Sequence, residues 1–164
     1  LEYPRVTFMD ALLARLVLNA MTQALVAYII FTAILVLFET RTVLHFPAIF
    51  LGFLMALSLG FGVGVVNCYL STRYSLWPLV WSIATRPLFV ISCIFFVFDT
   101  IPLPYRDYLW WNPLVHIVGV TRSGFYPSYD AAYVSVAYVF CVSLCASAAG
   151  LLLLRRFHKD LMQL

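Results

Sequence analysis

Four long apolar segments constrain the fold of this chain more than any other feature of its sequence. They extend over residues 18–38, 46–70, 74–98 and 131–154, and Arg86 is the only charged residue within them. A segment of about 20 apolar residues can cross the hydrocarbon core of a bilayer as a helix. Lipid offers no hydrogen-bond partners, so each segment must satisfy its own backbone polar groups, as an α-helix does. The sequence therefore predicts an all-α, polytopic membrane protein with four transmembrane helices.

The low charge content supports this fold class. Charged residues make up 10% of the chain and hydrophobic residues 64%, whereas a soluble domain carries about 25% charged residues. So few charges cannot cover the surface of a soluble domain. Most of the surface is therefore expected to face lipid.

The distribution of Lys and Arg indicates the orientation. Four crossings put both chain ends on one side of the membrane, and Lys and Arg accumulate in cytoplasmic loops. The side with the chain ends carries six of these residues and the other side carries three, which predicts cytoplasmic termini. The six are Arg5, Arg15, Arg73, Arg155, Arg156 and Lys159, and the three are Arg41, Arg106 and Arg122.

Residues 6–16 precede the first apolar segment and have a different pattern. Apolar side chains recur there at helical spacing, with Arg5, Asp10 and Arg15 beside and between them. This pattern predicts an amphipathic helix on the cytoplasmic membrane surface. Such a helix could rest on the membrane alone, or it could dock a cytoplasmic partner.

Residues 99–130 lie between the last two predicted spans, on the external side. Their apolar core, residues 108–120, is 13 residues long and contains Pro113. It is too short to cross a bilayer and predicts a re-entrant or interfacial segment. Its dense aromatics could form a belt at the lipid headgroups, or stacking surfaces around a path for a bulky amphipathic ligand. These aromatics are Tyr105, Tyr108, Trp110, Trp111, Phe125, Tyr126 and Tyr129.

Arg86 lies near the middle of the third span and is followed by Pro87. An arginine at the centre of a bilayer costs about 2.5–3.5 kcal/mol, so it usually faces a polar interior. Arg86 is expected either to pair with an acidic group on a neighbouring helix or to line a wet path for an anionic substrate. Both alternatives place its side chain inward.

The second span carries small residues every four positions: Gly52, Ala56, Gly60 and Gly64. Small residues let the backbones of two membrane helices approach closely. This face is therefore expected to pack against another helix.

The sequence lacks the residues that several kinds of binding or catalytic site require. It contains no G-x-x-x-x-G-K-[ST] motif, so it does not bind ATP by a P-loop. The four cysteines lie inside predicted spans and have no histidine beside them, which argues against a metal site. Asp107, His116 and Arg122 are the only plausible catalytic set, and they would have to converge at one membrane face.

Several motifs together resemble a known family. They are Arg86-Pro87-Leu88-Phe89 continuing to residues 92–96, residues 111–116 followed by residues 122–126, the opening residues 1–6, and the final Arg155-Arg156-Phe157. In these motifs the chain resembles the polysaccharide-exporting ABC-2 permeases, and most closely the capsular polysaccharide export permeases of Gram-negative bacteria. The resemblance covers essentially the whole chain and implies that it is the C-terminal part of such a permease. It departs from the family pattern at Cys93, often glycine, and at Gly119, often acidic.

The resemblance also implies partners. Such permeases form homodimers in the inner membrane and pair with cytoplasmic ATP-binding subunits, which bind ATP and Mg, so no cofactor is expected in this chain. A periplasmic co-polymerase and an outer-membrane polysaccharide exporter are further expected partners, and nucleic acid is not. The ligand would be a lipid-linked polysaccharide.

The resemblance assigns residue roles as well. The expected surface facing the ATPase is formed by Arg5, Asp10 and Arg15. The expected substrate path is formed by Arg86, Tyr105, Arg106, Tyr108, Trp110, Trp111, Asn112, His116, Arg122, Phe125 and Tyr126. Three alternatives remain: export of O-antigen or teichoic acid, a membrane-embedded enzyme acting on lipid-linked sugars, and a channel.

Overall fold

The computed structural model describes residues 8–38 and 44–161. In this part of the chain all regular structure is helical, and the chain divides into two units, residues 1–42 and 43–164. Three helices are long and apolar enough to cross a membrane, with the crossing parts at Asp10–Ile34, Phe46–Arg73 and Val136–Arg156.

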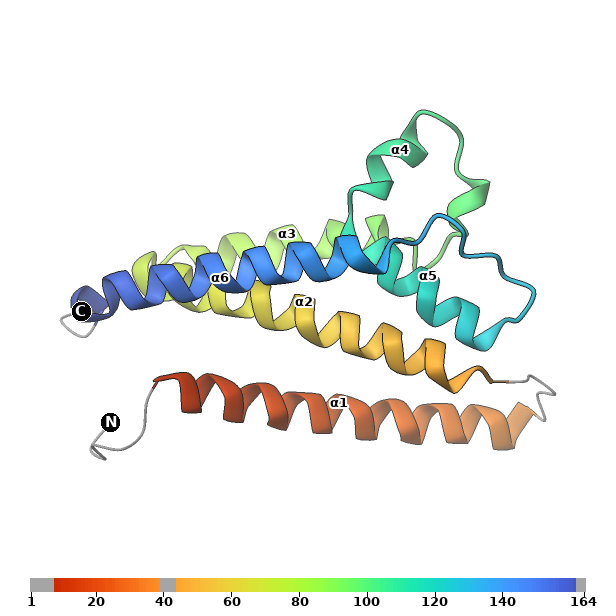
Figure 1. The fold of residues 1–164 in the computed structure, drawn as a ribbon, viewed down its shortest axis with the longest axis horizontal. Helices are drawn as coiled ribbons and strands as arrows, with labels where there is room; N and C mark the ends of the chain where they lie inside the picture. The colour runs from red at the N-terminus through yellow and green to blue at the C-terminus, as the bar shows by residue number, and fades with distance from the viewer. Residues whose placement is uncertain (1–7, 39–43, 162–164) are drawn as a thin grey trace. The chain divides into compact units, whose positions relative to one another are not determined.

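The first unit contains one helix, α1 (Phe8–Phe38), of 31 residues. The sequence predicted a surface helix over residues 6–16 and a separate span over residues 18–38, but a single helix runs from Phe8 onward (Figure 1). No glycine or proline occurs between Phe8 and Phe38. Without a helix-breaking residue, nothing local separates the two predicted helices.

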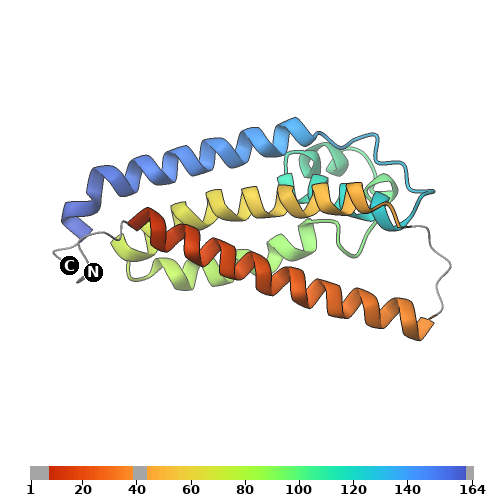
Figure 2. The same cartoon turned by 60° about the horizontal axis from the view of Figure 1, so that its bottom comes forward.

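The core of the second unit is formed by α2 (Phe46–Arg73), α5 (Pro113–Phe125) and α6 (Val136–Leu161). Met55 of α2 and Val139 of α6 are fully buried and pack in one cluster with Ile117 of α5. Figure 2 shows α2 between α6 and the helix that follows α2 in the chain. The short α5 lies against the first half of α2, where Thr121 contacts Gly52 and Gly124 contacts Ile49.

Glycines allow α2 and α6 to approach closely. A Cβ atom added to Gly62 would lie 2.7 Å from the backbone oxygen of Ser143, and one added to Gly150 would lie 2.9 Å from the backbone nitrogen of Val66. Ser58 donates a hydrogen bond of 3.2 Å to Ser143 across the same interface. Close backbone approach through small and hydroxyl residues is typical of membrane helix pairs.

Only part of the predicted ladder of small residues on α2 packs against another described helix. Gly52 contacts Thr121 of α5, whereas a Cβ atom at Gly60 or Gly64 would meet nothing within 4 Å among the described residues, and Ala56 is exposed. A spacing of four residues turns by about 400° on a 3.6-residue helix, so the ladder winds around α2. Its four members therefore do not share one contact face.

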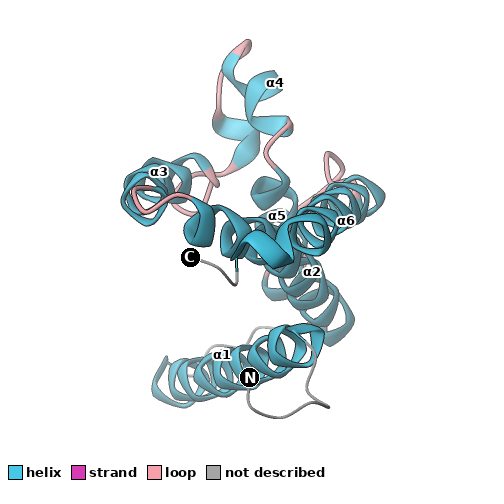
Figure 3. Cartoon of the chain, turned by 90° about the vertical axis from the view of Figure 1, so that its left-hand side faces the viewer, coloured by secondary structure: helices cyan, strands magenta, loops and turns pink. Residues whose placement is uncertain are grey.

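The third predicted span differs from the sequence-based prediction. The sequence predicted one helix over residues 74–98, but α3 covers only Trp77–Ile91, followed by the short helices η1 (Phe98–Thr100) and α4 (Tyr105–Trp110). At 1.5 Å per residue, 15 residues give about 22 Å, less than the roughly 30 Å of a hydrocarbon core. No residue of α3 is buried among the described residues, and in Figure 3 this helix stands apart from α2 and α6.

Candidate functional site

The side chain of Arg122, on α5, binds the backbone segment that follows the end of α3. Its guanidinium donates hydrogen bonds to the backbone oxygens of Phe96 (3.0 Å), Ile94 (3.0 Å) and Cys93 (3.3 Å). These carbonyl groups lie beyond the end of α3 at Ile91 and have no partner within a helix. Arg122 supplies donors at this point, and its guanidinium also lies 5.6 Å from the ring centre of Tyr129.

Asn112 starts α5. Its side-chain oxygen accepts a hydrogen bond of 3.1 Å from the backbone nitrogen of Leu114, and Pro113 occupies the first turn. Asparagine before a helix and proline at its first position are both favoured. The Asn112 Nδ2 atom is buried and has no hydrogen-bond partner among the described residues. The side chain of this predicted substrate-path residue thus caps a helix.

His116 is fully buried and both of its ring nitrogens are bonded. The backbone N–H of Ser135 donates to Nδ1 at 3.2 Å, so Nε2 carries the proton and donates to the backbone oxygen of Trp110 at 2.9 Å. His116 therefore joins α5 to the start of α6 as a neutral imidazole and presents neither nitrogen to a substrate.

Aromatic side chains surround this imidazole. Trp110 meets it edge-on at 5.2 Å and Tyr138 meets it at 5.4 Å, with Trp110 stacked on Tyr138 at 5.4 Å. Trp110 also donates to the backbone oxygen of Tyr133 at 3.0 Å, and Tyr138 donates to that of Trp111 at 2.7 Å. These contacts fix α4, α5 and the start of α6 to one another.

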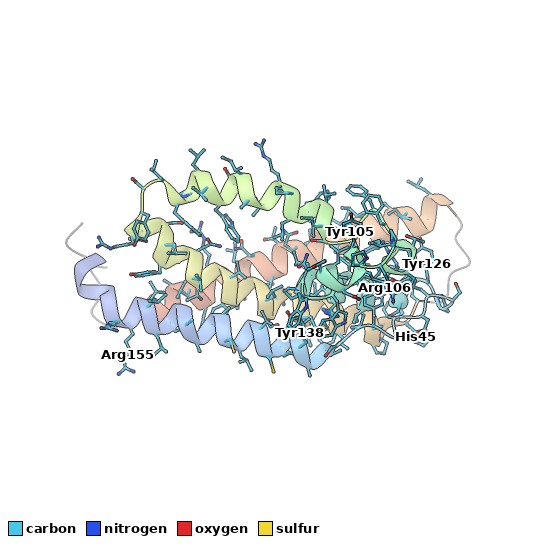
Figure 4. All side chains as sticks on the ribbon, turned by 90° about the horizontal axis from the view of Figure 1, so that it is seen from above. His45, Tyr105, Arg106, Tyr126, Tyr138 and Arg155 are labelled. Atoms are coloured by element: carbon cyan, nitrogen blue, oxygen red, sulfur yellow. The ribbon has the colours of Figure 1, made fainter. Side chains whose placement is uncertain are left out.

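Other predicted substrate-path residues lie at the surface of the same end. The exposed fractions are 77% for Tyr108, 67% for Trp111 and 66% for Tyr105. Tyr126 is also exposed, and Phe125 and Arg106 are partly buried, Arg106 lying over the ring of Phe98 at 5.9 Å. Figure 4 shows Tyr105, Arg106 and Tyr126 at the same end of the molecule as His45, with Arg155 at the opposite end.

Arg86 lies away from this end, within α3, and its side chain is exposed. The expectation that it faces the interior is not met within this chain, because α3 packs too loosely to enclose it. Among the described residues Arg86 has no hydrogen-bond or ion-pair partner. Of the expected ATPase-facing residues, Asp10 and Arg15 are exposed near the start of α1, and Arg5 lies outside the described residues.

Sequence reasoning did not find Ser135, Tyr133 and Tyr138, which complete the surroundings of His116. All three lie within the segment 131–154, predicted as an uninterrupted span, whereas α6 begins at Val136, after Tyr133 and Ser135. The two tyrosines at the start of that apolar segment were the available signal, since tyrosine is frequent at membrane interfaces.

The three long apolar helices and the short helices gathered at one end define a multi-pass helical membrane protein. No family model matches the chain. It is 30% identical over 154 residues to the polysialic acid transport protein KpsM of Escherichia coli, a match that covers 94% of this chain and 60% of that protein.

Two further relatives carry related names. The capsule polysaccharide export inner-membrane protein BexB of Haemophilus influenzae is 26% identical over 161 residues, covering 97% of this chain and 60% of BexB. The capsule polysaccharide export inner-membrane protein CtrC of Neisseria meningitidis serogroup B is 26% identical over 163 residues, with 97% and 60% covered. The chain is therefore related along nearly its whole length to inner-membrane proteins of capsule polysaccharide export, and it spans about 60% of their length.

Proposed function

We propose that this chain is part of the permease subunit of an ABC transporter that exports a capsular polysaccharide across the bacterial inner membrane. The observation that carries the proposal is the similarity to KpsM, BexB and CtrC over at least 94% of the chain. In this proposal the permease is a homodimer, and a separate cytoplasmic subunit binds ATP and Mg. The polysaccharide is lipid-linked and passes on to a periplasmic co-polymerase and an outer-membrane exporter.

The proposed topology has α1, α2 and α6 as complete spans, while α3 and α5 share the fourth crossing. Trp77, at the start of α3, donates to the Asn67 side chain near the end of α2 at 2.7 Å, which supports α3 beginning at the cytoplasmic side. At the other end of α2, the N–H of His45 donates to the backbone oxygen of Gly124 at 2.9 Å. Between them Met55 packs in one cluster with Ile117, near the start of α5. These contacts support α5 as the outward arm of a re-entrant segment, with its start deep along α2 and its end at the external side.

The proposed substrate path uses the predicted residues in two ways. Exposed rings at Tyr105, Tyr108, Trp111 and Tyr126 are suited to stack on sugar rings, and Arg106 lies beside them to attract an acidic glycan. The hydrogen bonds of Asn112, His116, Trp110 and Arg122 support positioning roles behind that surface. Arg86, exposed on α3, is the candidate contact for an acidic glycan within the membrane.

The proposed surface for the ATP-binding subunit lies at the start of α1. Asp10 and Arg15 are exposed there, and Arg5 precedes them in the sequence. Charged side chains at the cytoplasmic end of a membrane helix are suited to contact a soluble subunit through complementary charges.

Copurification with an ATPase tests the proposed function directly. The full-length permease is expressed with a tag together with the ATP-binding subunit encoded beside it, and the detergent-extracted complex is assayed for ATP hydrolysis. A stable complex whose hydrolysis changes on addition of lipid-linked capsular glycan is the expected result. Failure of any ATPase to copurify, with ion conduction or sugar modification by the permease alone, would overturn the proposal. A response to O-antigen or a teichoic acid instead would change the substrate and keep the transport class.

Export should depend on the exposed aromatics. Tyr108→Ala and Trp111→Ala are expected to lower surface capsule by about two- to tenfold, as loss of an aromatic contact worth about 0.5–1.5 kcal/mol implies. The matched control is Tyr74→Ala, which removes an exposed tyrosine just after α2. Surface capsule is measured with antibody, and permease in the membrane is quantified alongside. Equal export by all three variants would show that the rings of Tyr108 and Trp111 do not line the substrate path.

A further inference from the structure

The end of α3 is not explained by the residues around it. The apolar run continues as Ser-Cys-Ile-Phe-Phe-Val-Phe over residues 92–98, without glycine, proline or charge. Such a sequence does not stop a membrane helix, yet α3 ends at Ile91. The cause of the break must therefore lie elsewhere in the fold.

Cys93 shows that the break is locally unfavourable. Its φ of 57° lies in the left-handed region, and it is the only non-glycine residue with positive φ in the described part of the chain. A Cβ atom makes this conformation costly for any residue except glycine. The thiol is buried in a cluster with Phe98 and Val115, so the turn is held by tertiary packing.

Arg122 supplies the contacts that the break requires. It lies 26 to 29 positions away in the sequence and donates to the backbone oxygens of Phe96, Ile94 and Cys93. A guanidinium has five donors in a fixed planar arrangement, so one side chain can serve several carbonyl groups at once. Carbonyl groups outside a helix need such a partner, because no N–H group of the helix reaches them.

We propose that Arg122 is a positioning residue that ends α3 from outside, and that its release lets α3 continue from Ile91 toward Phe98. In the continuing helix the carbonyl groups of Cys93 and Ile94 accept from the backbone N–H groups of Val97 and Phe98. The freed guanidinium keeps a partner in the ring of Tyr129, now 5.6 Å away. The chain thus has a short and a long form of α3.

The two forms place the external aromatics differently. The helix α4, which carries Tyr105 and Tyr108, follows α3 through residues 92–104. Adding the seven residues of the segment 92–98 to α3 lengthens that helix by about 10 Å. Release of Arg122 therefore moves α4 relative to α3 by a distance that spin labels resolve.

The test measures this distance in the full-length permease. Cys68, Cys141 and Cys145, which are exposed, are replaced by serine, and spin labels are attached to cysteines introduced at Leu79 and Tyr108, both of which are exposed. Arg122→Gln is expected to add a population shifted by several ångströms, up to about 10 Å. The matched control Arg106→Gln removes a cation that contacts the Phe98 ring and should keep the wild-type distribution. A folded Arg122→Gln protein with the wild-type distribution would overturn the proposal.

A second pair of variants tests the same equilibrium with Arg122 in place. Cys93→Ala and Cys93→Gly both remove the thiol, but alanine favours a continuous helix whereas glycine adopts positive φ without strain. The ratio of long to short forms should be at least about fivefold higher with alanine than with glycine, because helix propensity and the strain at positive φ act in the same direction. Equal ratios would overturn the proposal even where Arg122→Gln fails to fold.

Discussion

Replacing His116 with alanine is expected to destabilise the protein by about 3–5 kcal/mol, the range found when a large buried ring is truncated. The ring is fully buried among Trp110, Tyr133 and Tyr138, so its removal leaves a cavity. It also leaves the carbonyl group of Trp110 and the N–H group of Ser135 without their partner. Each buried polar group left unpaired costs about 1–3 kcal/mol.

The chain offers a matched control for this experiment. His45 is exposed, and the bonds that it forms with Gly124, Ala48 and Ile49 use its backbone atoms. His45→Ala is therefore expected to change the melting temperature little. Thermal unfolding of the purified permease, followed by the fraction that stays monodisperse in detergent, compares the two variants. Similar melting temperatures would show that His116 does not hold α4, α5 and α6 together.

The long helices were predictable because local hydropathy determines them. The structure forms α2 over Phe46–Arg73 and α6 over Val136–Leu161, close to the predicted segments 46–70 and 131–154. The fusion of two predicted helices into α1 was also open to local reasoning, because no glycine or proline lies at the expected boundary. In both cases the information lies within a few turns of the helix itself.

The end of α3 could not be predicted in this way. It depends on hydrogen bonds from Arg122 to Cys93, Ile94 and Phe96, more than 25 residues away in the sequence. Hydropathy averaged over a short window depends only on the local apolar run, which extends through Phe98. It therefore predicts that the helix continues to Phe98. Long-range contacts of this kind override local propensity, and one chain without aligned relatives gives no signal for them.

The candidate site was predicted by region but not by the role of each side chain. The density of aromatics in residues 99–130 identified the region, but composition does not distinguish Trp110 from Trp111. Trp110 is partly buried and donates to Tyr133, whereas its neighbour Trp111 is 67% exposed. Adjacent residues on a helix point about 100° apart, so their burial depends on which face packs, and that is known only once α5 and α6 are placed.

Leucine at Gly62 is expected to separate α2 from α6 and to cost at least about 3 kcal/mol, the upper part of the range for overpacked cores. Even a Cβ atom at this position would lie 2.7 Å from the backbone oxygen of Ser143 and 3.0 Å from the Cβ atom of Ala146. The first of these neighbours is backbone, which moves only if the whole helix moves. The Ser58–Ser143 hydrogen bond should break at the same time.

The same helix supplies the controls, because Gly60 and Gly64 lie two positions to either side of Gly62. A Cβ atom at either would meet nothing within 4 Å among the described residues. Leucine is a much better helix former than glycine, by up to about 1 kcal/mol. Gly60→Leu and Gly64→Leu should therefore be neutral or slightly stabilising, while Gly62→Leu lowers the melting temperature and the yield of monodisperse protein. If leucine at Gly60 or Gly64 proves as damaging as at Gly62, that open face of α2 is covered by another helix in the assembled permease.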